Sequence, residues 1–159
     1  MTEARNGTIY YKKSRFITHL PEGRLYTRSH HWLFQAEPAG VWRIGMTKFA
    51  NRMLGDIVEF GFNVQRGAPV EVGQAVGWME GFKAISDIYC VAKGEFVRAN
   101  PALDADITLL DTKPYGEGWL YEVRGVAEPE AVDVAGYVAI LDATIDKMVD
   151  SRHDEDTHV

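Results

Sequence analysis

One lysine stands between two stretches that favour β-strands, and its position suggests chemistry at a side-chain amine. Residues 75–79 are apolar and follow a turn signal at residues 72–74, while residues 85–91 are rich in β-branched and aromatic side chains. Two such runs around a few residues that include glycine predict a β-hairpin. Lys83 would lie at or near its tip, where an enzyme that acylates one particular lysine could reach its amine.

The stretches on either side of this hairpin resemble each other. Residues 68–76 and 92–98 each combine a strand, a glycine turn and a second strand. This quasi-repeat suggests two similar half-sheets that pack on each other, with the lysine hairpin between them. With these features alone, an ordinary surface lysine on a β-hairpin would be the better interpretation, so the rest of the chain has to decide.

Length, charge and cysteine content restrict the class of protein. A chain of 159 residues suits one domain, and its 46% hydrophobic residues can build one core. The net charge of −6 argues against a nucleic-acid binder, and the single cysteine, Cys90, excludes an internal disulfide. No apolar run approaches the roughly 18 residues of a membrane helix and no signal-peptide core is present, so we expect a cytoplasmic protein without membrane insertion.

The hydrophobic pattern predicts a mainly β fold with two helices. A short helix at residues 47–54, capped by Thr47 and Gly55, should close one end of a barrel, and an amphipathic helix should span residues 134–149. For the acidic segment 100–113, the sequence pattern does not decide whether a further short helix is present. Strands are expected at residues 31–37, Val41–Met46, 56–62 and 118–123. The side chains expected to be largely buried are Trp32, Trp42, Ile44, Val58, Val76, Ile88 and Trp119.

Four blocks of sequence, in this order and at these separations, carry a resemblance to a known family. The blocks are YTRSHHW at residues 26–32, GMT at 45–47 with LGD at 54–56, EGFKAISDIY at 80–89 and PYGEGWL at 114–120. Over roughly residues 24–148 the chain resembles the lipoyl-carrying H-proteins of the glycine cleavage system.

The resemblance implies a fold, a cofactor and a domain organisation. The fold would be a lipoyl-type barrel-sandwich hybrid with two half-sheets, a short capping helix and a C-terminal helix. Lipoic acid would be attached to Lys83 through an amide. Residues 1–23 would be an N-terminal extension, as short strands or as an arm on the barrel; residues 24–150 would form the lipoyl domain with its C-terminal helix, and residues 151–159 a disordered tail.

The resemblance also implies a carrier rather than an enzyme, because the attached group performs the chemistry and the protein positions it. The sequence agrees, since we find no convincing nucleophile–base pair, phosphate-binding loop or metal-ligand cluster in it.

The resemblance further suggests which residues surround the arm. In the family the loaded arm folds back into a cleft, near a serine and a glutamate of the first block and an aspartate four residues after the lysine. Ser29 and Asp87 match this pattern, whereas His31, which follows His30, replaces the glutamate. Glu80 either presents the lysine or keeps the hairpin edge soluble. The expected site is therefore Lys83 with Glu80, Asp87, Ser29, His30 and His31, and no metal.

Two further departures from the family lie near the lysine. Gly81 and Phe82 replace the usual serine and valine, and the glycine is expected to loosen the turn. Cys90 replaces a small residue or proline and is expected to be a buried structural thiol rather than a redox partner.

The exchange at His31 leads to a preference among three functions. A histidine cannot attract a cationic amine as a carboxylate does, and it would tolerate or attract an anionic adduct. With these departures the chain resembles the H-protein-like lipoate-binding proteins of the sulfur-oxidising, heterodisulfide-reductase-like system, and this resemblance implies a carrier of a sulfur intermediate, which is the preferred interpretation. The alternatives are an aminomethyl carrier of the glycine cleavage system and a non-lipoylated module for binding or lipoate relay.

Each function implies its own partners. A lipoylated carrier needs a lipoate ligase or another lipoyl-attaching enzyme. A sulfur carrier would meet a heterodisulfide-reductase-like complex and sulfur transferases. An aminomethyl carrier would meet glycine decarboxylase, aminomethyltransferase and dihydrolipoamide dehydrogenase.

Overall fold

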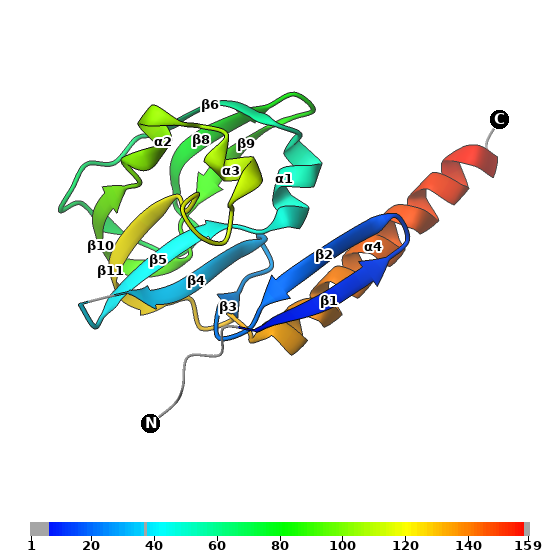
Figure 1. The fold of residues 1–159 in the computed structure, drawn as a ribbon, viewed down its shortest axis with the longest axis horizontal. Helices are drawn as coiled ribbons and strands as arrows, with labels where there is room; N and C mark the ends of the chain where they lie inside the picture. Colours follow the sequence, from blue (N-terminus) through cyan, green and yellow to red (C-terminus); the bar gives the residue numbers. More distant parts are fainter. Residues whose placement is uncertain (1–6, 37, 158–159) are drawn as a thin grey trace.

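The strands form two sheets and a separate hairpin (Figure 1). The computed structural model describes residues 7–36 and 38–157. The larger sheet contains, in spatial order, β3 (Leu25–Tyr26), β4 (His31–Ala36), β5 (Val41–Met46), β11 (Tyr121–Ala127), β10 (Ala92–Ala99) and β7 (Pro69–Val70). The smaller sheet contains β6 (Ile57–Phe62), β8 (Ala75–Gly81) and β9 (Ile85–Tyr89). The expected mainly β architecture is confirmed, although the two sheets are unequal in size.

Turn chemistry and alternation explain how the strands form. The turn between β4 and β5 has Gly40 in the left-handed region, with φ of 89°, a conformation that glycine adopts without strain. Across this hairpin Leu33 pairs with Ile44, and both side chains are buried, while the neighbouring Phe34 is exposed. The expected strand 31–37 ends at Ala36 in the structure, and Glu37 lies outside the described residues.

Helix α1 (Lys48–Leu54) begins and ends where the sequence predicts. The Thr47 side chain accepts a hydrogen bond from Ala50 N, and Gly55 ends the helix with φ of 76°. The acidic segment 100–113, where the sequence pattern does not decide on a helix, contains two short helices, α2 (Ala102–Ala105) and α3 (Leu109–Thr112).

The strand expected at residues 118–123 begins later, at Tyr121. The preceding residues form turns, and Trp32 Nε1 donates a hydrogen bond to the Pro114 carbonyl. This contact joins the first and last of the four sequence blocks.

Helix α4 (Val134–Thr157) is longer than the sequence predicts. The expected end near residue 149 is wrong, because the helix runs through most of the segment expected to be a disordered tail. No proline or glycine follows Gly136 in the sequence, so this segment lacks the two residues that most disfavour a helix. The expected buried face is present, with Tyr137, Leu141 and Ile145 in the core. Among the described helices, none combines the length and apolar character needed to cross a membrane.

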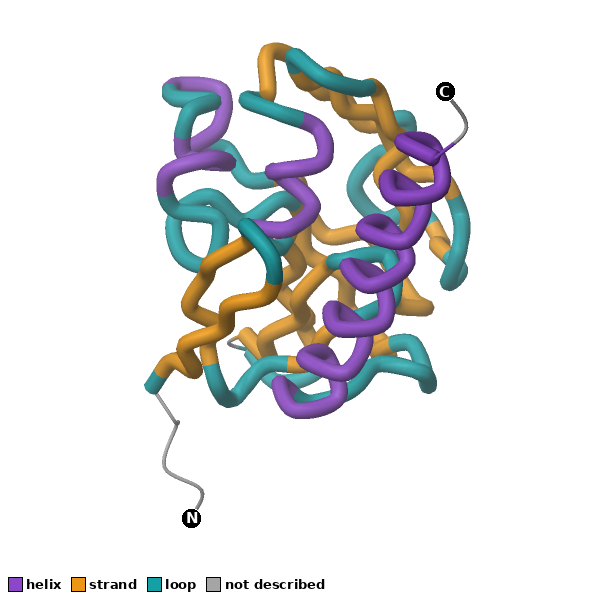
Figure 2. The backbone as a smooth tube through the Cα atoms, turned by 90° about the vertical axis from the view of Figure 1, so that its right-hand side faces the viewer, coloured by secondary structure: helices purple, strands orange, loops and turns teal. Residues whose placement is uncertain are grey.

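The N-terminal extension is the hairpin of β1 (Thr8–Lys13) and β2 (Phe16–Pro21). It lies along α4, on one side of the two larger sheets, and α4 itself runs down that side (Figures 1 and 2). Tyr11 Oη donates a hydrogen bond of 2.9 Å to Asp142, and Lys13 Nζ lies 3.0 Å from an Asp146 carboxylate oxygen. The extension therefore forms short strands, one of the two expected alternatives.

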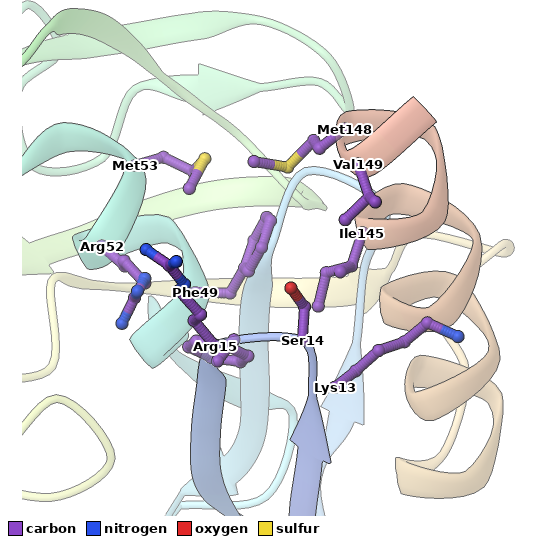
Figure 3. Close-up of a pocket in the computed structure, with 10 residues that line it drawn as sticks. Lys13, Ser14, Arg15, Phe49, Arg52, Met53, Ile145, Met148 and Val149 are labelled. Atoms are coloured by element: carbon purple, nitrogen blue, oxygen red, sulfur yellow. The ribbon is translucent and has the colours of Figure 1, made fainter. Parts of the chain in front are cut away.

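The turn of this hairpin meets α1 and α4 around a small pocket of about 80 Å³ (Figure 3). Met53 of α1 and Met148 of α4 point toward one another across it, while Arg15 and Arg52 lie on one side. The rings of Phe16 and Phe49, which also line this pocket, meet edge to face, with centroids 5.4 Å apart. The extension thus contributes apolar side chains to the core that supports α1.

Two apolar clusters make up the core. One fills the space between the two sheets, and the other joins the hairpin, β4, α1 and α4. Of the side chains expected to be buried, five are buried as predicted: Trp32, Ile44, Val76, Ile88 and Trp119. Trp42 is only partly buried, and Val58 is 46% exposed. The prediction for Val58 is wrong because the pairing of β6 with β8 is irregular between Ile57 and Glu59, and such a bulge turns a side chain out of the core.

Adjacent residues of β2 provide a test of the hairpin's contribution to the core. Phe16 is 6% exposed, whereas Ile17 is 52% exposed. We expect Phe16→Ala to lower the free energy of unfolding by about 3–5 kcal/mol through loss of buried area and the cavity it leaves. Ile17→Ala should change it by only about 0.5 kcal/mol. Urea unfolding measures both, and equal effects would contradict this packing.

Candidate functional site

Lys83 lies in the turn between β8 and β9, as the sequence predicts. The turn is closed by a hydrogen bond of 2.9 Å from Gly81 N to the Ala84 carbonyl, and the side chains of Phe82 and Lys83 are exposed. Lys83 Nζ lies 3.5 Å from the carbonyl oxygen of Arg52, near the end of α1. The amine is therefore accessible to a modifying enzyme.

Backbone hydrogen bonds fix this turn against the C-terminal end of α1. Lys83 N donates to the Leu54 carbonyl at 2.8 Å, and Phe82 N donates to the Asp56 carbonyl at 3.1 Å. The last carbonyls of a helix have no partner within the helix, so the lysine's own amide satisfies one of them. The backbone of Lys83 thus fixes the point from which its exposed side chain extends.

Two glycines make this close approach possible. A Cβ at Gly81 would lie 2.1 Å from the Leu54 carbonyl oxygen, and one at Gly55 would lie 3.1 Å from both Lys83 N and Lys83 Cγ. The expectation that Gly81 loosens the turn is therefore wrong. Its missing side chain lets the turn dock tightly on α1.

A methyl group at Gly81 should therefore displace the lysine. We expect Gly81→Ala to cost about 1–3 kcal/mol in unfolding free energy, because backbone atoms must move to relieve the clash. It should also slow the acylation of Lys83 by a lipoate ligase. Gly116→Ala is the matched control, since a Cβ there meets no atom of the described residues within 4 Å. Unfolding and acylation rates that are the same in both variants would contradict the docking argument.

Four of the expected site residues come together at a cavity of about 230 Å³. Ser29, His30, His31 and Asp87 line it, whereas Lys83 and Glu80 do not do so in the described part of the chain. Apolar side chains from α1, β5, β8 and β9 line the remainder, and they include Met46, Ala50, Met53, Leu54, Met79 and Ile88. We call this cavity the cleft.

The cleft also contains and contacts residues that no sequence motif indicates as part of a site. The sequence pattern places Met46 and Met79 in strands and Met53 on one face of the short helix, and side-chain alternation along β8 and β9 puts Met79 and Ile88 on one face. Tyr137 of α4 accepts or donates hydrogen bonds of 2.8 Å to both His30 Nδ1 and Thr47 Oγ1. No local signal links this tyrosine to residues about 90 and 107 positions away.

Both histidines are held in a neutral form by burial. His31 is 6% exposed, and its Nδ1 lies 2.9 Å from Ser29 Oγ. Burial lowers the pKa of His31 to about 4, with a smaller contribution from the nearby His30, and burial likewise lowers the pKa of His30 to about 4. The expected attraction of an anionic adduct needs a positive charge, so it is not available near neutral pH. Asp87 is the one carboxylate that lines the cleft among the described residues.

These pKa values predict how stability depends on pH. The pKa in the folded state lies below the ordinary value of 6.5, so the unfolded chain binds protons more readily. The stabilisation of the folded state by the neutral histidine is complete above pH 6.5 and is lost as the pH falls toward 4. For His31 this loss lowers the free energy of unfolding by about 2 kcal/mol between about pH 7.5 and pH 5. Urea unfolding should show a weaker pH dependence in His31→Gln. In the control His19→Gln, which alters an exposed side chain of β2, the wild-type dependence should remain.

The residues present fit a lipoyl group on Lys83. Its amine is exposed on a fixed turn, and the cleft beside it offers apolar walls with polar atoms of Ser29, His31 and Asp87. Apolar walls suit a hydrocarbon chain, and a few placed polar groups suit a functional group at its end. Cys90 is 1% exposed and its thiol donates to the Ala92 carbonyl, as expected for a structural thiol.

Comparison with known proteins gives consistent matches. Residues 24–140 match the family model described as glycine cleavage H-protein. The glycine cleavage system H protein of Corynebacterium jeikeium is 39% identical over 125 residues, which are 77% of this chain and 98% of that protein. The protein of the same description from Thermus thermophilus is 37% identical over 128 residues, 78% of this chain and 97% of its own.

A solved structure agrees with these sequence matches. The crystal structure of a glycine cleavage system H protein from Mycobacterium marinum superposes with a TM-score of 0.67 at 35% identity, covering 76% of this chain and 97% of that one.

Proposed function

The chain belongs to the glycine cleavage H-protein family, and we propose that it is the aminomethyl carrier of a glycine cleavage system. Members of this family are lipoyl carriers rather than catalysts, with lipoate bound covalently to a lysine. The lipoyl group supplies the disulfide and thiol chemistry, and the protein supplies its position. We assign the attachment to Lys83, through an amide.

The docked turn is the observation that carries this assignment. Lys83 is held by its backbone on the end of α1, while its amine stays accessible. A tethered group at a fixed point reaches each partner enzyme at a high effective concentration. The partners would be a lipoyl-attaching enzyme such as a lipoate ligase, and glycine decarboxylase, aminomethyltransferase and dihydrolipoamide dehydrogenase.

The cleft suits a cationic amine better than an anionic sulfur adduct. The Asp87 carboxylate offers charge pairing, and the Ser29 hydroxyl and the neutral His31 ring add uncharged polar atoms. An ammonium group has three donors and no acceptor, so it needs oxygen and nitrogen lone pairs of this kind. The sulfur-oxidation interpretation depended on the charge of His31, and its lowered pKa removes that argument. The named relatives also favour the aminomethyl alternative.

A paired substitution tests the carrier function. Wild-type protein incubated with lipoate and a ligase should gain one lipoyl mass on the peptide that contains Lys83, and should then support glycine–bicarbonate exchange with a heterologous glycine decarboxylase. Lys83→Arg should lose both, because a guanidinium is not acylated by this chemistry. Lys93→Arg, at a lysine whose side chain is 69% exposed, is the control and should keep both.

The outcomes separate the candidate functions. Lipoylation without exchange would reject the aminomethyl role and return the sulfur carrier to consideration. The absence of lipoylation would favour the third candidate, a binding or lipoate-relay module.

A further inference from the structure

A second groove lies next to Lys83, on the opposite side of α1 from the cleft. The cleft is lined by Ala50, Met53 and Leu54, whereas this groove, of about 420 Å³, is lined by Asn51, Arg52 and Gly55 among others. At about 100° per residue these two sets occupy opposite faces of the helix. Strand β2 and the Lys83 turn complete the walls of the groove.

The lysine side chain lies in this groove rather than in the cleft. Lys83 is among the groove's lining residues, its Cγ is 3.1 Å from the position of a Cβ on Gly55, and its Nζ lies 3.5 Å from the Arg52 carbonyl oxygen. Any group that extends the amine from this position begins within the groove.

The walls of the groove suit a hydrocarbon chain. Phe16 and Ile17 of β2 face it together with Phe82, and Ile17 and Phe82 are 52% and 78% exposed. Besides Lys83, two cationic and two acidic described side chains line it: Lys48, Arg52, Asp56 and Asp111. Their charges balance, and acylation removes the charge of Lys83, so the groove favours an uncharged occupant.

One polar atom of the groove residues has no partner. Asn51 is 7% exposed, and its Nδ2 donates to the Leu110 carbonyl at 2.7 Å. Its Oδ1 is buried and, within the described residues, has no hydrogen-bond partner. A buried acceptor without a donor costs free energy. Because this oxygen is enclosed, the cost is one of packing, and the oxygen offers no contact to an occupant of the groove.

The β2 wall is a feature of this chain's extension. The family match begins at residue 24, after the end of β2. The Corynebacterium and Mycobacterium relatives align over 98% and 97% of their own lengths with only about three quarters of this chain. Phe16 and Ile17 therefore add a wall beyond the part that matches the family.

We propose that this groove is a second seat for the lipoyl arm, which holds the arm while it carries no cationic group. The proposal rests on the attachment of lipoate to Lys83. The acyl chain lies against Phe16, Ile17 and Phe82. The cleft, with Asp87, receives the arm when it bears an amine. Because both seats flank α1, the arm exchanges between them by rotation about the lysine side chain, without movement of the backbone.

Nuclear Overhauser effects between the arm and the protein test the second seat. The sample is full-length, lipoylated and oxidised protein whose modification at Lys83 has first been located by peptide mass. We expect contacts from the lipoyl methylene protons to Ile17 and Phe82. Ile17→Asp should lower the equilibrium constant for occupancy of the groove about fourfold, the factor for the loss of one methylene group's apolar burial, and should thereby weaken the Phe82 contacts. Tyr10→Asp, at a 59% exposed side chain of the same hairpin, should leave them unchanged.

Each other result rejects the second seat. With Lys83 lipoylated, contacts only to cleft residues such as Met79 and Ile88, or no contacts at all, exclude it while the carrier function stands. Equal weakening in Ile17→Asp and Tyr10→Asp would also exclude it, because the effect would then not come from the groove. A lipoyl group found on another lysine rejects both the second seat and the assignment of Lys83.

Discussion

The backbone contact between the β8–β9 turn and the end of α1 is the constraint on which the rest of the site depends. Lys83 N donates a hydrogen bond to the Leu54 carbonyl, and Gly81 and Gly55 permit the turn and the helix to approach this closely. A carrier lysine on a free loop would spread its attached group over a large volume. Here the turn is hydrogen-bonded to α1, so the side chain that carries the group begins at a defined point beside the helix.

Helix α1 can serve as that fixed support because it is packed from several sides. It has only seven residues, and so short a helix has little stability of its own in water. Its Phe49 contacts Phe16 of the N-terminal hairpin and His30 of the loop before β4, while Thr47 binds Tyr137 of α4. The extension outside the family match therefore supports the helix that holds the lysine, and it also forms one wall of the groove beside it.

Burial determines the electrostatics of the cleft. Two adjacent histidines would provide positive charge at a surface position, but the structure encloses them and satisfies one ring nitrogen of each with a hydroxyl group. The lowered pKa values leave Asp87 as the charged group of the cleft. In the adjacent groove the charges balance. The two faces of α1 thus differ in the charge that they favour in an attached group, and this difference is the basis for two seats of one arm.

The sequence by itself determined the features that depend on local chemistry. Alternation and glycine turns predicted the β8–β9 hairpin with Lys83 at its tip, and Thr47 and Gly55 predicted the ends of α1, because a strand pair, a turn and a cap each involve residues close together in the chain. Tertiary structure alone decided which faces these elements present and which segments meet. The bulge in β6 that exposes Val58, the role of Gly81, the neutral state of His31 and the hairpin wall near Lys83 all result from contacts between segments distant in the sequence. The same physical reason applies to each: burial and desolvation depend on the whole set of neighbours, which a pattern of residue types along one segment does not contain.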